Sequence, residues 1–199
     1  MKLGIDPRFE YQIGTKRGED LTLIESSTIP QTITTISELT SALVEAERAT
    51  FGKILKSLDL PLEELREKGV WSKDHYTRTC IIENENLELI LLCWEAGQAT
   101  PVHDHGGEEC WVYFVDGNFK ETIFTENEEG KLVPSKVTNV TTGDLTYMID
   151  SMGYHDLQNV DQTRSMSIHL YANPIPRCNA LNRETGEVEE RELSFDSRM

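Results

Sequence analysis

From about residue 76 onward, the chain consists of short apolar runs separated by polar turns, which is the pattern of β-strands. Several turns carry strong signals, among them Asp116-Gly117-Asn118, and no helical pattern lies between the runs. Many short, closely spaced strands are typical of an antiparallel sandwich or barrel. We expect strands at 76–83, 87–95, 109–116, 119–126, 131–138, 145–149, 154–160 and 165–172, and a closing hairpin formed by 179–184 and 187–195.

The segment before residue 70 has a helical pattern. Ser37 is placed to be an N-cap, and apolar residues follow at helical spacing, at Leu39, Leu43, Val44, Ala46 and Phe51. Pro61 begins a second short helix over residues 62–68, which Gly69 ends. Residues 1 to about 35 are polar and poorly patterned, and they predict an irregular arm that lies on the domain.

A chain of 199 residues is long enough for one domain with a substantial core. We expect residues 1–70 to form the arm and the helices that pack on a barrel, and residues 71–199 to form that barrel with its hairpin. The predicted fold class is therefore mainly β, with a short helical part before the strands.

The net charge of the chain limits the classes of partner that it can bind. A net charge of −16 disfavours nucleic acid and anionic membranes, since both need a basic face. No apolar run approaches the ~18 residues of a membrane helix, and no apolar segment after Met1-Lys2 resembles a secretion signal. We therefore expect a small-molecule ligand, a cytoplasmic location, no nucleic acid and no membrane, and we favour a monomer while oligomeric state stays open.

The four cysteines fit that location. Their spacing contains no CxxC pair, which argues against a zinc ribbon or a thioredoxin-type motif. Four cysteines in a chain of this size, Cys80, Cys93, Cys110 and Cys178, need not form a disulfide framework.

His103 and His105 provide the first sign of a metal site. Two histidines separated by one residue project to the same side of an extended chain, and neutral imidazole is a common ligand of divalent metals. His155 follows a turn-rich segment and can face the same interior of a β-barrel, which gives three nitrogen ligands and open positions for chemistry. A carboxylate could complete the set instead, from Asp150, Asp104 or Glu109.

Two further strands carry polar residues on one face. Ser167, His169 and Tyr171 alternate with apolar residues, so they either line a cavity as a hydrogen-bonded network or face solvent. Tyr76 and Arg78 share a face of the first expected strand. An inward arginine would have to meet an anion such as a carboxylate, whereas an arginine on the surface needs no such partner.

These features together resemble a known family. The spacing Gly97-x5-His103-x-His105-x4-Cys110-x6-Gly117 is similar to the first motif of the cupin superfamily, and residues 143–159 match its second motif more loosely. Between about residues 71 and 195, the order of several motifs resembles the cysteine dioxygenase family: Tyr76-Thr77-Arg78, His103-Asp104-His105, Cys110, Gly117-Asn118-Phe119-Lys120-Glu121-Thr122, Asp150-Ser151 with Gly153 and His155, Ser167-Ile168-His169-Leu170-Tyr171, Cys178, Thr185-Gly186 and Ser194-Phe195.

The resemblance implies a cupin-type antiparallel β-barrel or jelly roll that holds Fe(II) on His103, His105 and His155. It also implies that L-cysteine binds the iron through its thiolate and amine, and that both atoms of O2 are added to sulfur to give cysteine sulfinate. Arg78 would bind the substrate carboxylate, and Tyr76 would help to hold Arg78 in place.

Within the family, the residues matching Ser167, His169 and Tyr171 belong to the catalytic group, with Tyr171 beside the bound ligands. In some members the cysteine that matches Cys110 is joined by a thioether to the tyrosine that matches Tyr171. This chain has both residues, so the resemblance allows a Cys110–Tyr171 cross-link. The alternative for Cys110 is a small buried apolar residue.

Two departures from the vertebrate pattern of the family stand out. Tyr171 is followed by Ala172-Asn173-Pro174 in place of Ser-Pro-Pro, which argues against a proline-dependent cis turn. Glu109 stands where histidine is frequent and would leave an acid close to the metal.

Three other functions compete. Dioxygenases of 3-mercaptopropionate tend to carry glutamine at the position of Arg78, so Arg78 favours cysteine. A non-catalytic cupin that binds a metal or ligand would keep the histidines without needing Arg78 and Tyr171 together. A zinc hydrolase ranks last, because no general base is evident in the sequence.

Overall fold

The computed structural model describes residues 32–199, in which residues of mainly antiparallel β-sheet outnumber the helical residues. The larger sheet has the strand order β11-β1-β2-β8-β3-β6, the second has the order β5-β4-β7, and β9 pairs with β10. Only β11 runs parallel to its neighbour, β1, among the described pairs. The strands are β1 (Thr77–Glu83), β2 (Glu88–Trp94), β3 (Cys110–Asp116), β4 (Asn118–Glu126), β5 (Leu132–Thr141), β6 (Leu145–Met148), β7 (Tyr154–Asn159), β8 (Ser165–Tyr171), β9 (Arg177–Leu181), β10 (Val188–Glu192) and β11 (Ser197–Arg198).

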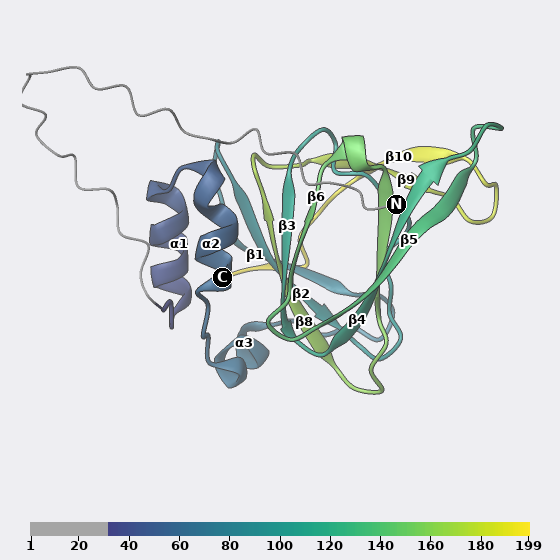
Figure 1. Cartoon of the computed structure of the whole chain (residues 1–199). Coiled ribbons are helices and arrows are strands. Elements are labelled where there is room, and N and C mark those ends of the chain that lie inside the picture. Colours follow the sequence, from purple (N-terminus) through teal and green to yellow (C-terminus); the bar gives the residue numbers. More distant parts are fainter. Residues whose placement is uncertain (1–31) are drawn as a thin grey trace, which may run out of the picture.

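The expected strands and the closing hairpin are all present, and the mainly β fold class is confirmed. The two larger sheets are arranged like a jelly roll without closing into one continuous barrel (Figure 1). β5 continues to Thr141, beyond its expected end at residue 138, and the hairpin begins at Arg177 rather than at residue 179. β11 was not predicted, because two residues are too few to show an alternating pattern.

The helical part differs from the prediction at its start. Thr35, and not Ser37, is the N-cap of α1 (Ile36–Glu45): its side chain accepts a hydrogen bond from the backbone of Glu38, whose carboxylate bonds back to the backbone of Thr35. Ser37 lies inside the first turn. The sequence contains the Thr-x-x-Glu pattern of this capping box at residues 35–38, whereas the spacing of the apolar residues alone favours Ser37 as the N-cap.

The apolar residues after Ser37 belong to more than one helix. α1 ends at Ala46, whose backbone is extended, and η1 (Arg48–Thr50) leads into α2 (Phe51–Lys56). α3 (Leu62–Lys68) begins after Pro61 and ends before Gly69, as predicted. The arm expected over residues 1 to about 35 lies almost entirely outside the described residues, and the division of the chain at residue 70 stays a prediction.

β2 and β8 are buried along their whole length, because both faces of the larger sheet are covered. On one face, α1 and α2 pack against the sheet, as Figure 1 shows, and Leu39, Phe51 and Leu55 join Leu91 and Ile168 in a single apolar cluster. The opposite face meets the sheet of β4, β5 and β7 through a second cluster, which includes Ile90, Leu92, Trp94, Val112, Phe114, Phe119, Val140 and Leu157. Polar side chains on the inner face of β8 are therefore enclosed between the sheets.

The cysteines and the turn after β8 complete the description of the fold. The four cysteines are free and buried. Residues 32–199 contain no cis peptide bond, and Asn173 turns the chain after β8 with a φ of 82°, a conformation that asparagine tolerates better than most residues. None of the helices in this part of the chain has the length and apolar character needed to cross a membrane.

Gly153 makes the turn that leads into β7 and gives the first testable prediction. Its φ is 103°, and an added Cβ would overlap the carbonyl oxygen of Phe124 on β4. Replacing Gly153 by alanine should lower the free energy of unfolding by about 3 kcal/mol, because backbone strain adds to this clash. Urea denaturation of the metal-free protein measures the effect.

Gly143→Ala is the matched control. Gly143 has a φ of 86°, but no other atoms lie within 4 Å of the position of its added Cβ. The Gly143→Ala substitution should lower the free energy of unfolding by only about 1 kcal/mol, because backbone strain is its only cost. Equal losses in the two variants would contradict the role assigned to close packing at Gly153.

Candidate metal centre and its cavity

The structure brings His103, His105 and His155 together, as the sequence predicted. One ligand atom from each lies within 4.8 Å of the others. His103 and His155 exchange two backbone hydrogen bonds of 2.9 Å, so a segment before β3 is fixed beside β7. Of the other two histidines, His75 bonds Asp196 at 2.9 Å and His169 belongs to a separate network, so neither joins the cluster.

The ring nitrogens of this cluster suit a divalent metal. Nδ1 of His103 lies 3.0 Å from the carbonyl oxygen of Pro101, and Nδ1 of His155 lies 3.0 Å from a carboxylate oxygen of Glu121. These acceptors favour the tautomer whose Nε2 lone pair is free for a metal. Nδ1 of His105 is buried without a hydrogen-bond partner in the described part of the chain.

The charge state of the cluster also fits. Burial lowers the pKa of all three histidines, and the repulsion between neighbouring rings lowers those of His105 and His155 further. The imidazoles are therefore neutral near pH 7, which leaves lone pairs available for a cation. Three neutral nitrogens accept zinc, nickel, manganese or iron, so the residues indicate a metal without selecting one.

The carboxylates considered as alternative ligands have other partners. Asp150 accepts hydrogen bonds from the backbone of His105 and Gly107, at 2.9 and 2.6 Å, and so shapes the loop. Asp104 accepts bonds from the backbone and side chain of Asn179. Among residues 32–199, neither joins the ligand atoms of the cluster.

Glu109 is also directed elsewhere. Its carboxylate accepts a 2.6 Å hydrogen bond from the hydroxyl of Tyr147 and lies 3.3 Å from Arg48. It is not one of the clustered ligand groups in the described residues, and its charge is engaged by partners outside the histidine cluster.

The polar face of β8 is buried and does not face solvent: Ser167, His169 and Tyr171 all lie between the sheets. The indole N–H of Trp94 donates to Ser167 Oγ at 3.0 Å, and Oγ lies 3.0 Å from His169 Nε2. An indole only donates, so Ser167 accepts from Trp94 and its hydroxyl proton stays available for a hydrogen bond to His169. Burial lowers the pKa of His169 well below its ordinary value, so the ring is neutral.

Trp94 was missed in the sequence. The available signal was its position at the end of an apolar strand, where a buried indole N–H needs an acceptor. Tyr76 stacks on its ring with 4.8 Å between centroids, so one tryptophan supports both the serine of β8 and the tyrosine before β1.

Cys110 and Tyr171 lie opposite each other in the paired strands β3 and β8. Both are buried, and burial raises the pKa of the Cys110 thiol and of the Tyr171 phenol. Each group therefore keeps its proton near pH 7. Whether they become cross-linked stays a prediction.

Arg78 is an inward residue rather than a surface one. Its side chain is only 11% exposed, and Nη2 bonds the carboxylate of Glu88 at 3.1 Å. The buried Nε has no hydrogen-bond partner among the described residues. Glu88 was missed because a glutamate that opens a strand gives no sign in the sequence of facing inward.

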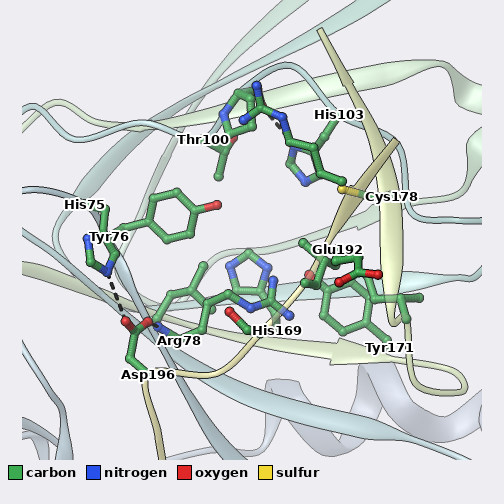
Figure 2. Close-up of a pocket in the computed structure, with 16 residues that line it drawn as sticks. His75, Tyr76, Arg78, Thr100, His103, His169, Tyr171, Cys178, Glu192 and Asp196 are labelled. Atoms are coloured by element: carbon green, nitrogen blue, oxygen red, sulfur yellow. Dashed lines mark hydrogen bonds and ion pairs between the residues drawn. The ribbon is translucent and has the colours of Figure 1, made fainter. Parts of the chain in front are cut away.

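A cavity of about 320 Å³ lies beside Arg78 and is also lined by His103, His169 and Tyr171, as Figure 2 shows. Arg78, His103, His169 and Tyr171 contribute polar atoms, while Leu92 and Ile175 contribute apolar wall. The cation of Arg78 and the imidazole of His103, a candidate metal ligand, thus face one cavity, which suits a small ligand with an anionic end and a metal-binding end.

The fold and the site define a β-protein of the jelly-roll class with a candidate metal centre built from three histidines. A model of the family "Cysteine dioxygenase type I" matches residues 19–184, and the chain belongs to this family. The match includes the three clustered histidines, Arg78 and the polar residues of β8.

Individual relatives agree with this assignment. Cysteine dioxygenase type 1 of Rattus norvegicus is 30% identical over 127 residues, which cover 62% of this chain and 64% of the rat protein. The Bos taurus protein of the same name is 25% identical over 176 residues, which cover 85% and 88% of the two chains. The matched segment thus spans somewhat less than two thirds of the rat relative.

Solved structures are more distant. An uncharacterised Klebsiella pneumoniae protein with a double-stranded β-helix domain has a TM-score of 0.47 at 14% identity, covering 64% of this chain and 87% of that one. An RmlC-like cupin protein from Desulfovibrio desulfuricans has a TM-score of 0.41 at 19% identity, covering 54% and 91%.

Glu121 provides a test of the metal centre. Its carboxylate is buried, bonds His155 Nδ1 and receives a second bond from Thr146 at 3.3 Å. Glu121→Gln should weaken Fe(II) affinity about 10- to 100-fold, because a neutral amide orients and polarises the imidazole less well. Competition with a coloured chelator under anaerobic conditions measures the dissociation constant.

Glu126→Gln, on an exposed position of the same strand, is the control and should leave the affinity unchanged. If Glu121→Gln bound iron as tightly as this control, the carboxylate would have no part in supporting the ligand.

Proposed function

We propose that this protein is an iron-dependent thiol dioxygenase that converts L-cysteine to cysteine sulfinate. The observation that carries the proposal is a cavity lined both by Arg78, a buried cation, and by His103, one of the three clustered histidines. Membership of the cysteine dioxygenase family supports the reaction and the choice of Fe(II) over other metals.

The proposed reaction is RSH + O2 → RSO2H. The thiol sulfur gains both oxygen atoms and is oxidised by four electrons, all of which reduce the dioxygen, so no further reductant is needed. Fe(II), held by His103, His105 and His155, would supply the redox chemistry that allows dioxygen to react with a thiol.

Arg78 would bind the substrate's carboxylate. A guanidinium presents donors in a planar fork that matches a carboxylate, and the buried Nε of Arg78 lacks an acceptor among the described residues. The side chain of Arg78 is also largely buried, which strengthens the interaction. The distance between the cation and the histidines would then select thiols that carry a carboxylate a short span away.

Tyr171 would act as a proton-bearing group beside the substrate. Since burial raises the pKa of its phenol, the hydroxyl stays protonated and can donate a hydrogen bond to an oxygen atom of the bound ligands. Ser167 and neutral His169, fixed by Trp94, would position it. We keep the thioether between Cys110 and Tyr171 within the proposal, supported by their opposed positions in β3 and β8.

Location and assembly belong to the proposal as well. Four buried free cysteines are consistent with a reducing cytoplasm. A monomer remains the prediction.

Replacing Arg78 by glutamine tests the assignment of substrate. With Fe(II) loaded equally, kcat/KM for L-cysteine should fall about 100-fold, chiefly through KM, because a charge-assisted hydrogen bond is lost in a buried site. Oxygen uptake, with mass analysis of the product, measures this. Arg198→Gln changes an arginine that is 60% exposed and should have little effect.

3-Mercaptopropionate, assayed in parallel, separates the competing functions. Faster turnover of this thiol by the unchanged protein would replace cysteine as the substrate while retaining the chemistry. No oxygen uptake with either thiol, in protein shown to hold iron, would favour a non-catalytic cupin.

A further inference from the structure

Glu88 is a buried carboxylate for which the proposed reaction has no use. It opens β2, is 2% exposed, and places Oε1 3.1 Å from Nη2 of Arg78. Its second oxygen accepts a 3.2 Å hydrogen bond from the backbone of Ile175. The side chain of Glu88 thus links β2 to β1 and to the segment after β8.

The pair with Arg78 changes what the cavity offers an anion. Burying a carboxylate is costly unless a cation or several donors meet it, and Arg78 is the cation within hydrogen-bonding distance of Glu88 in the described chain. The guanidinium and the carboxylate together carry no net charge. A substrate carboxylate that binds Arg78 therefore meets a fixed like charge on the far side of the same guanidinium.

The pair also directs the guanidinium. A guanidinium has five N–H donors in a fixed plane, and Glu88 engages Nη2. The buried Nε of Arg78 is without a partner in residues 32–199. The bond to Glu88 fixes one end of the guanidinium plane beside β2 and leaves Nε as a donor for a ligand.

We propose that Glu88 is a specificity-determining residue, which orients Arg78 through their ion pair and limits the attraction that Arg78 exerts on the carboxylate of a substrate. The inference rests on the proposed function, because it assumes that Arg78 binds that carboxylate. Glu88 touches neither the substrate nor the histidine cluster and acts through Arg78 alone.

Glu88→Gln separates charge from orientation. The amide keeps an oxygen that can accept from Arg78 Nη2, but the like charge is removed. L-cysteine should then bind about tenfold more tightly, since unit charges a few ångströms apart interact appreciably at the effective dielectric of a protein interior. Cysteamine has the same thiol and amine but no carboxylate, so its dissociation constant should not change.

Both ligands are titrated anaerobically into the Fe(II)-loaded protein, which measures binding without turnover. Glu83→Gln is the matched control, because Glu83 lies opposite Glu88 in the sheet but pairs with the exposed Arg198. It should leave both dissociation constants within twofold. Glu88→Asn, which removes the charge and leaves room for water, serves if the glutamine variant does not fold.

The outcomes are distinct. Tighter binding of L-cysteine alone supports the inference. Unchanged or weaker binding of L-cysteine, or equal tightening of both ligands, overturns it while the proposed function stands. Failure of the unchanged protein to bind L-cysteine overturns the proposed function and this inference with it.

Discussion

The three-histidine cluster depends on two reciprocal backbone hydrogen bonds between His103 and His155. They join the segment before β3 to β7, two parts of the chain that are far apart in sequence, and His105 follows within the same loop. β7 is itself fixed by its pairing with β4, which carries Glu121 to the ring of His155. A displacement of either segment would separate the ligand atoms, so the metal centre is a consequence of sheet register.

A second constraint is the enclosure of the larger sheet on both faces. Helices cover one face and the sheet of β4, β5 and β7 covers the other, so each polar group between the sheets needs a partner. Trp94 satisfies Ser167, and Glu88 satisfies part of Arg78. Three buried side-chain atoms are without hydrogen-bond partners among the described residues: Nε of Arg78 and Nδ1 of His105, which belong to the proposed site, and Oδ1 of Asp156 on β7.

The sequence predicted much of the fold, because alternating apolar residues and turn signals directly report strands and their ends. The HxH spacing also indicated a site at His103 and His105 with His155 as a candidate third ligand, and the family resemblance favoured this histidine over a carboxylate. It could not reveal which polar faces are enclosed, because that depends on what packs above them. Glu88 and Trp94 were missed for this reason: their roles arise from cross-strand neighbours, which no local pattern records.

The most direct test of the account is the origin of the oxygen atoms in the product. Fe(II)-loaded protein is incubated with L-cysteine under ¹⁸O2 in ordinary water, and the product is analysed by mass spectrometry. The account predicts cysteine sulfinate with both sulfur-bound oxygen atoms labelled. A sulfinate with only one labelled oxygen atom, or cystine as the sole product, would contradict the addition of both atoms of O2 to sulfur at this site.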